Sequence, residues 1–319
     1  MGVSGGADSV ALLRIVAELK QKNGGEGKII AAHFNHGWRG QDSDEDAKFV
    51  EALAGDLGIP FRLGKVAGSK LTSPDQSPQS EESARNQRYD FLIATAHEEG
   101  ARYLATAHTA DDQVETVLHR ILRGTGLKGL GGIPATRQLS ESVSAIRPML
   151  TIQREEVVAY LASIGQTCRT DSSNQDCKYT RNRIRHQLLP LLTDDYNPEV
   201  ATALLRLGSL AQQSQNEIDR IVDEFTSREL TVRQNQAAGT EVIVRKPALQ
   251  RLSRFLRCEV FKSVWSSQSW PMQSMGLEQW NKLADLADAD DATQLMLPGT
   301  IVVSANKQEI TLRSSLEVQ

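Results

Sequence analysis

Apolar and polar positions follow two different periods along the first half of the chain. Short runs of mostly small or β-branched apolar residues predict buried strands over 28–34, 59–66 and 102–108. Segments with apolar residues at helical spacing predict helices over 9–19, 42–57, 81–99 and 110–123. Strands that alternate with helices in this way are typical of a parallel sheet. We therefore predict an α/β fold with a doubly wound parallel sheet, in which ligands bind at the carboxyl ends of the strands.

The second half of the chain has a different pattern. Helices are predicted over 151–165 and 197–230, and the remainder mixes two helices with short strands over 241–245, 300–304 and 309–313. A length of 319 residues is enough for two domains. We predict a catalytic domain over 1–195, a linker helix over 196–230 and a small, mainly helical α+β domain for substrate recognition over 231–319.

The loop Ser4-Gly5-Gly6-Ala7-Asp8-Ser9 leads directly into the first apolar helix. Two glycines allow backbone N–H groups to come close to an anion, and a helix N-terminus attracts negative charge. The two serines add hydroxyl donors, and Asp8 can bind Mg²⁺ on a phosphate. A Gly/Ser/Asp turn that caps an ordinary helix is the alternative. The chain has no Walker motif, so we predict a phosphate-binding loop of another type.

A loop of this kind normally follows a central strand. Here Met1, Gly2 and Val3 precede it. A missing central strand leaves the backbone groups of its neighbours unpaired. We therefore expect that strand to be incomplete.

Polar residues also follow the strands predicted over 28–34 and 102–108. His33 and His36 end one strand, and His108 ends the other. Asp111, Asp112 and Glu115 lie within one helical turn of each other just beyond His108. Histidines at a strand end are often structural, and early acids can simply complement a helix dipole. Three carboxylates beside a second helix N-terminus favour a site for Mg²⁺ or for an amine nucleophile.

Two basic runs occur later in the chain. Arg181 and Arg185 are spaced to share one helix face, which suits phosphate binding. Residues 251, 254 and 257 are arginines, and we predict a basic stripe on one helix there. Solvated surface charge is the alternative in both cases. The Gly-x-Gly-x-x-Gly pattern over 124–129 follows a helix instead of a strand, so we predict a flexible loop and not a dinucleotide site.

Composition limits the classes of protein that remain. A net charge of −4 argues against general coating of nucleic acid, so nucleic-acid binding needs local basic patches. Three cysteines without a CxxC pair favour a reduced, cytoplasmic setting. No apolar run reaches 18 residues, so we expect no membrane partner. The oligomeric state stays open, with a homodimer as one possibility.

The order of these motifs resembles the tRNA(Ile)-lysidine synthetase family of the N-type ATP pyrophosphatases, or PP-loop enzymes. The resemblance rests on SGGADS at 4–9, HFNHGWR at 33–39, SEESARNQRYDFL at 80–92, HTADDQVET at 108–116, RGTGLKGLGGIP at 123–134 and RTDSSNQDCKYTRNRIRHQLLP at 169–190. LMLPG at 295–299 adds a weak match. The family implies a fold of the adenine nucleotide alpha hydrolase type. It also implies ATP and Mg²⁺ as cofactors, and L-lysine and a CAU-anticodon tRNA(Ile) as substrates.

The implied reaction joins lysine to C2 of the wobble cytidine through an adenylated intermediate, with release of pyrophosphate and then AMP. For this reaction we predict a role for each candidate residue. ATP is bound by Ser4, Gly5, Gly6, Ala7, Asp8, Ser9 and His33, with Asp8 on Mg²⁺. Catalysis falls to Asp111, Asp112 and Glu115. Substrate and tRNA are bound by His36, Arg39, Arg85, His108, Arg181, Arg185, Arg254 and Arg257.

Two other functions stay open. A related PP-loop enzyme that thiolates tRNA is disfavoured, because sulfur transfer typically needs paired cysteines, and Cys168 and Cys177 are nine residues apart. An inactive homologue that binds nucleotide or RNA is the second alternative, suggested by the short first strand. ATP binding without turnover would distinguish it.

Overall fold

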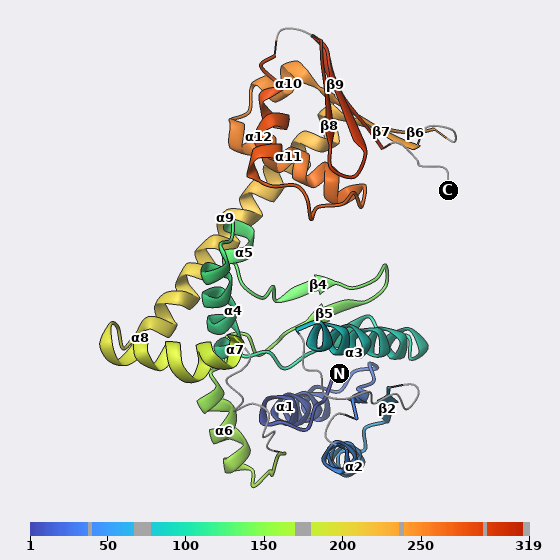
Figure 1. Cartoon of the computed structure of the whole chain (residues 1–319). Helices are drawn as coiled ribbons and strands as arrows, with labels where there is room; N and C mark the ends of the chain where they lie inside the picture. The colour runs from blue at the N-terminus through green and yellow to red at the C-terminus, as the bar shows by residue number, and fades with distance from the viewer. Residues whose placement is uncertain (38–39, 67–77, 170–179, 236–238, 290–291, 315–319) are drawn as a thin grey trace. The chain divides into compact units, whose positions relative to one another are not determined.

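The computed structural model describes residues 1–37, 40–66, 78–169, 180–235, 239–289 and 292–314. The chain forms two compact units, residues 1–212 and 213–319 (Figure 1). No helix within the described ranges is long and apolar enough to cross a membrane.

The sheet of the first unit is built around the first residues of the chain. Strands β1 (Ala31–Asn35) and β2 (Phe61–Lys65) pair in parallel. Strand β5 (Ser144–Ile146) pairs in parallel with β3 (Tyr103–Ala105) and antiparallel with β4 (Thr136–Gln138). Gly2 donates to Ala105 O at 3.0 Å, and Val3 donates to Ala32 O at 2.9 Å. Residues 1–3 therefore lie between β1 and β3 and pair with both of them.

Helices cover both faces of this sheet. Helices α1 (Ala7–Asn23), α2 (Gln41–Asp56) and α6 (Arg154–Ser163) pack on one face, where Leu13, Val50 and Val157 share a core with Val3 and Ala31. Helix α3 (Pro78–Glu98) packs on the other face through Leu92 and Ala96 (Figure 1). This arrangement confirms the predicted doubly wound α/β fold. The short strands β4 and β5 were not predicted.

The rest of the first unit is helical. Helix α4 (Ala110–Arg123) has the predicted bounds, and α5 (Leu127–Leu130) is a single turn in the predicted loop. Helix α7 (Thr180–Arg183) continues as a π-helical turn, η2 (Ile184–Leu188), and as α8 (Leu189–Asp195). Helix α9 (Val200–Glu229) follows, and the boundary between the two units falls inside it. The division into domains at 195 and 230 stays a prediction.

The second unit is a five-stranded antiparallel sheet with helices against one face. Its strand order is β6-β7-β10-β9-β8, and its core is centred on Phe261, Trp265 and Leu312. The strands are β6 (Leu230–Asn235), β7 (Gly239–Arg245), β8 (Thr293–Leu297), β9 (Ile301–Ala305) and β10 (Glu309–Ser314), and the helices are α10 (Lys246–Gln250), α11 (Arg254–Ser267) and α12 (Leu277–Asp285). The three predicted strands are present, and the sheet adds β6 and β8 at its edges.

The predicted basic stripe on one helix is wrong. Arg251 is the C-cap of α10, whereas Arg254 begins α11. The two helices are separate because Ser253 is the N-cap of α11, where its Oγ accepts the Leu256 N–H at 3.3 Å. The arginines therefore do not form a row along a single helix.

Candidate active site

The loop over residues 4–9 folds around the hydroxyl of Ser9. Ser9 Oγ accepts the N–H groups of Ser4 at 3.1 Å and Gly5 at 3.2 Å, and donates to Gly6 O at 2.9 Å. Gly5 has a φ of +94°, which L side chains rarely adopt. The Ser9 hydroxyl thus holds the loop in shape, so its predicted contact with phosphate would require it to leave these partners.

Helix α1 starts at this loop, and its first N–H groups have no partner within the helix. Gly6 is the N-cap, with an ordinary φ of −71°, and no side chain caps the helix end. These N–H groups lie at the carboxyl end of the segment 1–3, which is the position expected for a ligand in a parallel sheet. The loop and the helix end together form an anion-binding site.

Asp8 brings a carboxylate into this anion site. Its Oδ2 lies 3.3 Å from Arg154 Nη1, and its Oδ1 is buried without a hydrogen-bond partner in the described part of the chain. Burial raises the pKa of the Asp8 carboxyl, while the charge of Arg154 lowers it and that of Asp112 raises it further. A buried carboxylate oxygen with a free lone pair fits a cation bound between protein and phosphate.

Mg²⁺ fits this arrangement without a cage of protein ligands. No group of three or more His, Cys, Asp or Glu side chains suited to a metal occurs within the residues that the structure describes. Mg²⁺ commonly takes one or two carboxylates and completes its shell with phosphate oxygens and water. Asp8 is the residue that would hold it here.

Arg169, which follows α6 in the chain, holds the phosphate loop in position. Its N–H donates to Gly5 O at 2.9 Å, its Nε donates to Asp46 Oδ1 at 2.8 Å, and its Nη2 lies 3.1 Å from Glu45 Oε2. These contacts connect α2 to the phosphate loop. The sequence did not single out Arg169 as a site residue.

A second helix N-terminus lies beside the loop. Helix α4 begins with a capping box, in which Asp112 Oδ2 accepts the Thr109 N–H at 2.9 Å. Asp111 Oδ2 accepts the N–H of Arg154 at 2.8 Å. That N–H is free to donate because Arg154 is the first residue of α6. Arg154 therefore contacts both Asp8 and Asp111, and the sequence missed it.

Two arginines cover the remaining acids of α4. Arg181 Nε donates to Glu115 Oε2 at 2.8 Å, and its Nη2 donates to Asp112 Oδ1 at 2.9 Å. Arg185 Nε donates to Glu115 Oε1, and its Nη2 lies 3.7 Å from Asp112 Oδ1. The Glu115 side chain is 1% exposed. The structure thus confirms that Arg181 and Arg185 lie on the same side of their helical segment. That side faces Asp112 and Glu115.

Of the three predicted histidines, His36 directly follows β1 as expected, whereas His33 lies in the middle of β1 and His108 lies three residues beyond the end of β3. His33 Nδ1 is 2.8 Å from Val3 O, and His108 Nδ1 is 3.0 Å from Thr106 Oγ1. Burial lowers the pKa of His33, and it lowers those of His36 and His108 to about 4. Positive charge from Arg88 and His33 adds to this effect at His36. All three histidines are therefore neutral at pH 7, and the roles predicted for them stay predictions.

The glycine-rich stretch over 124–134 is held by side chains from α4 and by Arg147, which follows β5. Gln113 Oε1 accepts the Ile133 N–H at 2.6 Å, and its Nε2 donates to Gly131 O at 3.1 Å. Arg120 Nη1 donates to Gly129 O and Gly132 O, and Arg147 Nη1 donates to Pro134 O at 2.6 Å. Gln113 and Arg120 lie on α4, the helix that carries the acids. The predicted flexible loop is therefore held by defined contacts.

The other predicted site residues lie on other elements or outside the described residues. Arg85 is exposed on α3, with its guanidinium carbon 5.5 Å from the Tyr89 ring centroid. Arg39 lies outside the described residues. Arg254 is in the second unit and pairs with Asp285 at 2.6 Å. Its predicted contact with RNA stays a prediction.

Arg257 has a structural role. It is 7% exposed, and its guanidinium donates to the carbonyl oxygens of Leu249, Gln250 and Leu252 and to Asp288. These bonds close the turn between α10 and α11. A guanidinium held in this way is not presented to RNA, so the binding role predicted for Arg257 has no support in the structure.

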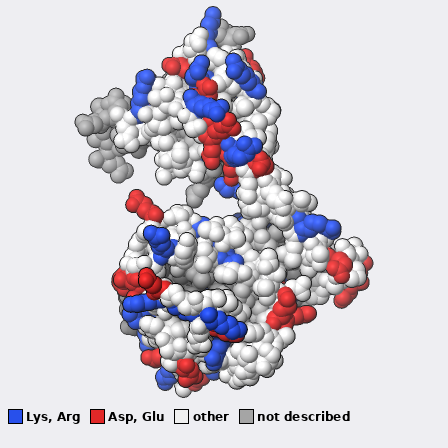
Figure 2. All heavy atoms as spheres, turned by 180° about the vertical axis from the view of Figure 1, so that it is seen from behind, with Lys and Arg blue, Asp and Glu red and all other residues white. Residues whose placement is uncertain are grey.

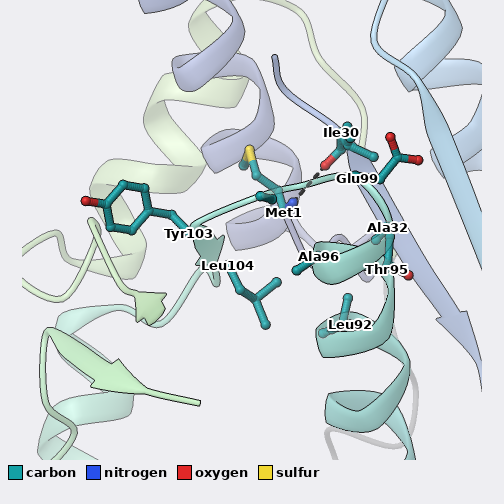
Figure 3. A pocket seen from close by; sticks show the side chains of 10 residues that line it. Met1, Ile30, Ala32, Leu92, Thr95, Ala96, Glu99, Tyr103 and Leu104 are labelled. Atoms are coloured by element: carbon teal, nitrogen blue, oxygen red, sulfur yellow. Dashed lines mark hydrogen bonds between the residues drawn. The ribbon is translucent and has the colours of Figure 1, made fainter. Parts of the chain in front are cut away.

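Two further surface features do not compete with this site. A cavity of about 30 Å³ beside Met1 is lined by residues that include Ile30, Leu92 and Leu104 (Figure 3). It lies at the amino ends of the strands, opposite the loop, and is too small for a nucleotide. Figure 2 shows Lys and Arg interspersed with Asp and Glu over the face in view, in line with the net charge of −4.

The fold and the loop define a PP-loop ATP-binding protein. A family model described as a PP-loop domain matches residues 1–192. The solved structure of a U34-tRNA thiolase, NcsA from Methanococcus maripaludis, aligns with a TM-score of 0.54 over 66% of this chain and 71% of that chain. Sequence identity is 21%, so this likeness concerns the fold alone.

Curated relatives narrow the class. The tRNA(Ile)-lysidine synthase of Rhodopirellula baltica is 30% identical over 98% of this chain and 90% of its own length. That of Geobacter sulfurreducens is 33% identical over 97% of this chain and 64% of its own length. That of Porphyromonas gingivalis is 41% identical over 65% of this chain and 43% of its own length. The chain therefore belongs to the tRNA(Ile)-lysidine synthase family of ATP-using ligases, and it spans less than two thirds of the second and third of these relatives.

Proposed function

We propose that the chain joins L-lysine to C2 of the wobble cytidine in a CAU-anticodon tRNA(Ile), at the expense of ATP. Family membership supports the substrates. The observation that carries the proposal is the convergence of two helix N-termini, those of α1 and α4, whose acids Asp8 and Asp111 both contact Arg154. The N-terminus of α1 suits a triphosphate, and the acids at the start of α4 suit a lysine ammonium.

In the first step, the C2 oxygen of cytidine attacks the α-phosphate of ATP, and pyrophosphate leaves. The chain's contribution is to orient the triphosphate. The loop N–H groups and the α1 N-terminus bind the negative charge that develops on the leaving pyrophosphate. Mg²⁺, held by Asp8, would neutralise phosphate charge. Arg169 keeps the loop in position through its bond to Gly5 O.

In the second step, the ε-amine of lysine attacks C2, and AMP leaves. The attacking amine must be neutral, so its ammonium proton must first pass to a base. Asp111, Asp112 and Glu115 supply negative charge that can hold the ammonium and accept its proton. Arg181 and Arg185 supply positive charge for phosphate oxygens. The His108 imidazole is neutral at pH 7 and can contact a nucleobase without adding charge.

Thiolation of tRNA is the second candidate, which the sequence left open on the basis of its PP-loop. Of the cysteines, Cys258 is buried in the second unit, Cys168 is exposed and Cys177 lies outside the described residues. A lysine-dependent product distinguishes the two functions.

The test combines the protein with ATP, Mg²⁺, labelled lysine and a tRNA(Ile) transcript that carries the CAU anticodon. We expect label in the tRNA when ATP is present, and none when ATP is omitted or when a methionine tRNA replaces the substrate. Asp8→Asn is expected to lose this activity, whereas Asp56→Asn, at an exposed acid near the end of α2, keeps it. ATP binding without label in any tRNA would contradict the proposal and favour an inactive homologue.

A further inference from the structure

Two of the three acids proposed to receive lysine already have cationic partners. Asp112 and Glu115 carry two negative charges, and Arg181 and Arg185 carry two positive charges, so the four side chains are neutral as a group. Both oxygens of Glu115 accept from an arginine, and both oxygens of Asp112 have donors. We call these four side chains the acid–arginine cluster.

Because the cluster is buried, it is unfavourable to remove its arginines alone or to add a lysine ammonium alone. Glu115 is 1% exposed, so removing its arginines without a replacement would leave an uncompensated buried carboxylate. Adding a lysine ammonium with both arginines in place would give the cluster a net positive charge. Each change is unfavourable alone, because a buried charge needs a partner.

A phosphate beside the cluster gives the arginines another partner, so that the lysine ammonium can replace them on the acids without leaving a buried charge unpaired. Arg154 lies 3.3 Å from Asp8 in the phosphate loop and donates its N–H at 2.8 Å to Asp111, the neighbour of Asp112, which places the cluster next to the loop. The side chains of Arg181 and Arg185 are 40% and 27% exposed, so their guanidiniums have room to turn. Planar guanidiniums bind phosphate oxygens as well as carboxylates.

We propose that ATP and lysine bind as a coupled pair through an exchange of partners in the acid–arginine cluster. The arginines turn from Asp112 and Glu115 to the phosphates, and the lysine ammonium takes their place on the acids. The inference rests on the proposed function and adds to it a regulation of the same site. Before ATP arrives, the acids are closed to lysine.

Thermodynamic linkage gives the exchange a measurable form. If ATP tightens lysine binding by some factor, lysine must tighten ATP binding by the same factor. Typical coupling between two sites lies in the range of roughly 5- to 150-fold. We expect a factor of about ten or more.

The experiment is isothermal titration calorimetry on the full chain without tRNA. Lysine is titrated into the protein alone, and into protein saturated with Mg²⁺ and α,β-methylene-ATP, in which a CH2 group that resists cleavage replaces the oxygen between the α- and β-phosphorus atoms. The analogue is then titrated with and without saturating lysine. We expect both affinities to rise by the same factor. Equal lysine affinity with and without the analogue would overturn the proposal, as would absence of lysine binding under both conditions.

Two variants assign the coupling to the cluster. Arg181→Gln removes one partner of both acids, so lysine should bind without the analogue and the coupling should fall toward one. Arg183→Gln is the matched control, because Arg183 is exposed on the same helix and bonds Thr180. Equal coupling in both variants would overturn the proposal. If Arg181→Gln does not fold, inorganic pyrophosphate replaces the analogue with the unmodified protein, and failure to raise lysine affinity overturns it.

The result separates the exchange from the function on which it rests. If labelled lysine enters tRNA(Ile) but binds equally well with and without the analogue, the coupling is wrong and the function stands. If lysine enters no tRNA and shows no binding, both are wrong.

Discussion

The guanidinium of Arg154 lies 3.3 Å from the carboxylate of Asp8, although 146 residues separate the two in sequence. The same arginine donates its backbone N–H to Asp111 at 2.8 Å. One residue at the start of α6 therefore links the phosphate loop to the acids of α4.

Replacement of Asp8 separates chemistry from RNA binding. We expect Asp8→Asn to slow pyrophosphate release by roughly 100-fold, because it removes the carboxylate placed to hold Mg²⁺ at the phosphates. Affinity for tRNA should stay within a factor of about two, since Asp8 adds no cation for the RNA backbone. Pyrophosphate release and filter binding measure the two effects. Parallel loss of both would mean that the substitution damages the fold.

The two glycines of the loop should respond differently to a methyl group. Gly5 has a φ of +94°, and a Cβ added there would contact the side chains of Val50 and Arg169. Gly5→Ala should therefore lower the unfolding free energy by about 1–2 kcal/mol, mainly because of the backbone strain. Gly6 has an ordinary φ and open space beyond Ser4 Oγ at 3.6 Å, so Gly6→Ala should fold normally. Its methyl group would occupy the phosphate cradle and weaken ATP binding roughly tenfold. Chemical denaturation and ATP titration test the pair, and unchanged ATP affinity in Gly6→Ala would place the phosphates elsewhere.

His108 should contribute to the loss of stability in acid. Burial lowers its pKa from 6.5 to about 4, so the unfolded chain binds the proton more readily than the folded one. Stability is therefore lost as pH falls from 6.5 toward 4, by at most about 3 kcal/mol from this group. His108→Gln should flatten that part of the profile of stability against pH. His97→Gln, at an exposed position on α3, is the control. Identical profiles for both variants would show that His108 does not titrate in this way.

Arg257 and Arg254 offer a matched pair in the second unit. Arg257→Ala breaks bonds to three carbonyl oxygens and to Asp288, and we expect a loss of about 2–4 kcal/mol in unfolding free energy. Arg254→Ala removes an exposed ion pair with Asp285 and should leave the unfolding free energy nearly unchanged, because water and salt screen such a pair. If Arg254 contacts tRNA, its loss should also reduce the salt dependence of binding. Similar melting temperatures for the two variants would contradict the structural role of Arg257.

Local sequence signals predicted the parts of the site that lie near one another along the chain. The loop from Ser4 to Ser9 and the acids of α4 each form a short pattern at a helix start. The spacing of Arg181 and Arg185 predicted a shared face, and both do contact Glu115. Periodicity reports neighbours three or four positions apart, and here those neighbours function together.

The same signals could not find Arg154 or Arg169. Their partners, Asp8 and Gly5, lie more than 140 residues earlier, and a charged residue carries no local sign of a distant partner. The error at Arg257 has a related cause. Regularly spaced arginines in a sequence do not reveal whether their side chains are exposed to solvent or buried in a turn. Ser253 was the available signal, since a serine before a helix commonly marks its first turn. Strands β4 and β5 are three residues each, too short for a period to show.

The long spans between partners have a consequence for synthesis on the ribosome. Asp8 and the acids of α4 emerge early, whereas the arginines that balance their charge emerge only once residues 154–185 have been made. Domains fold largely as units during synthesis, and contacts distant in sequence form late. A nascent chain that stops before residue 154 thus holds a phosphate loop without its cationic partners. Such a chain also lacks Arg181 and Arg185, the two arginines that we propose to bind the phosphates of ATP.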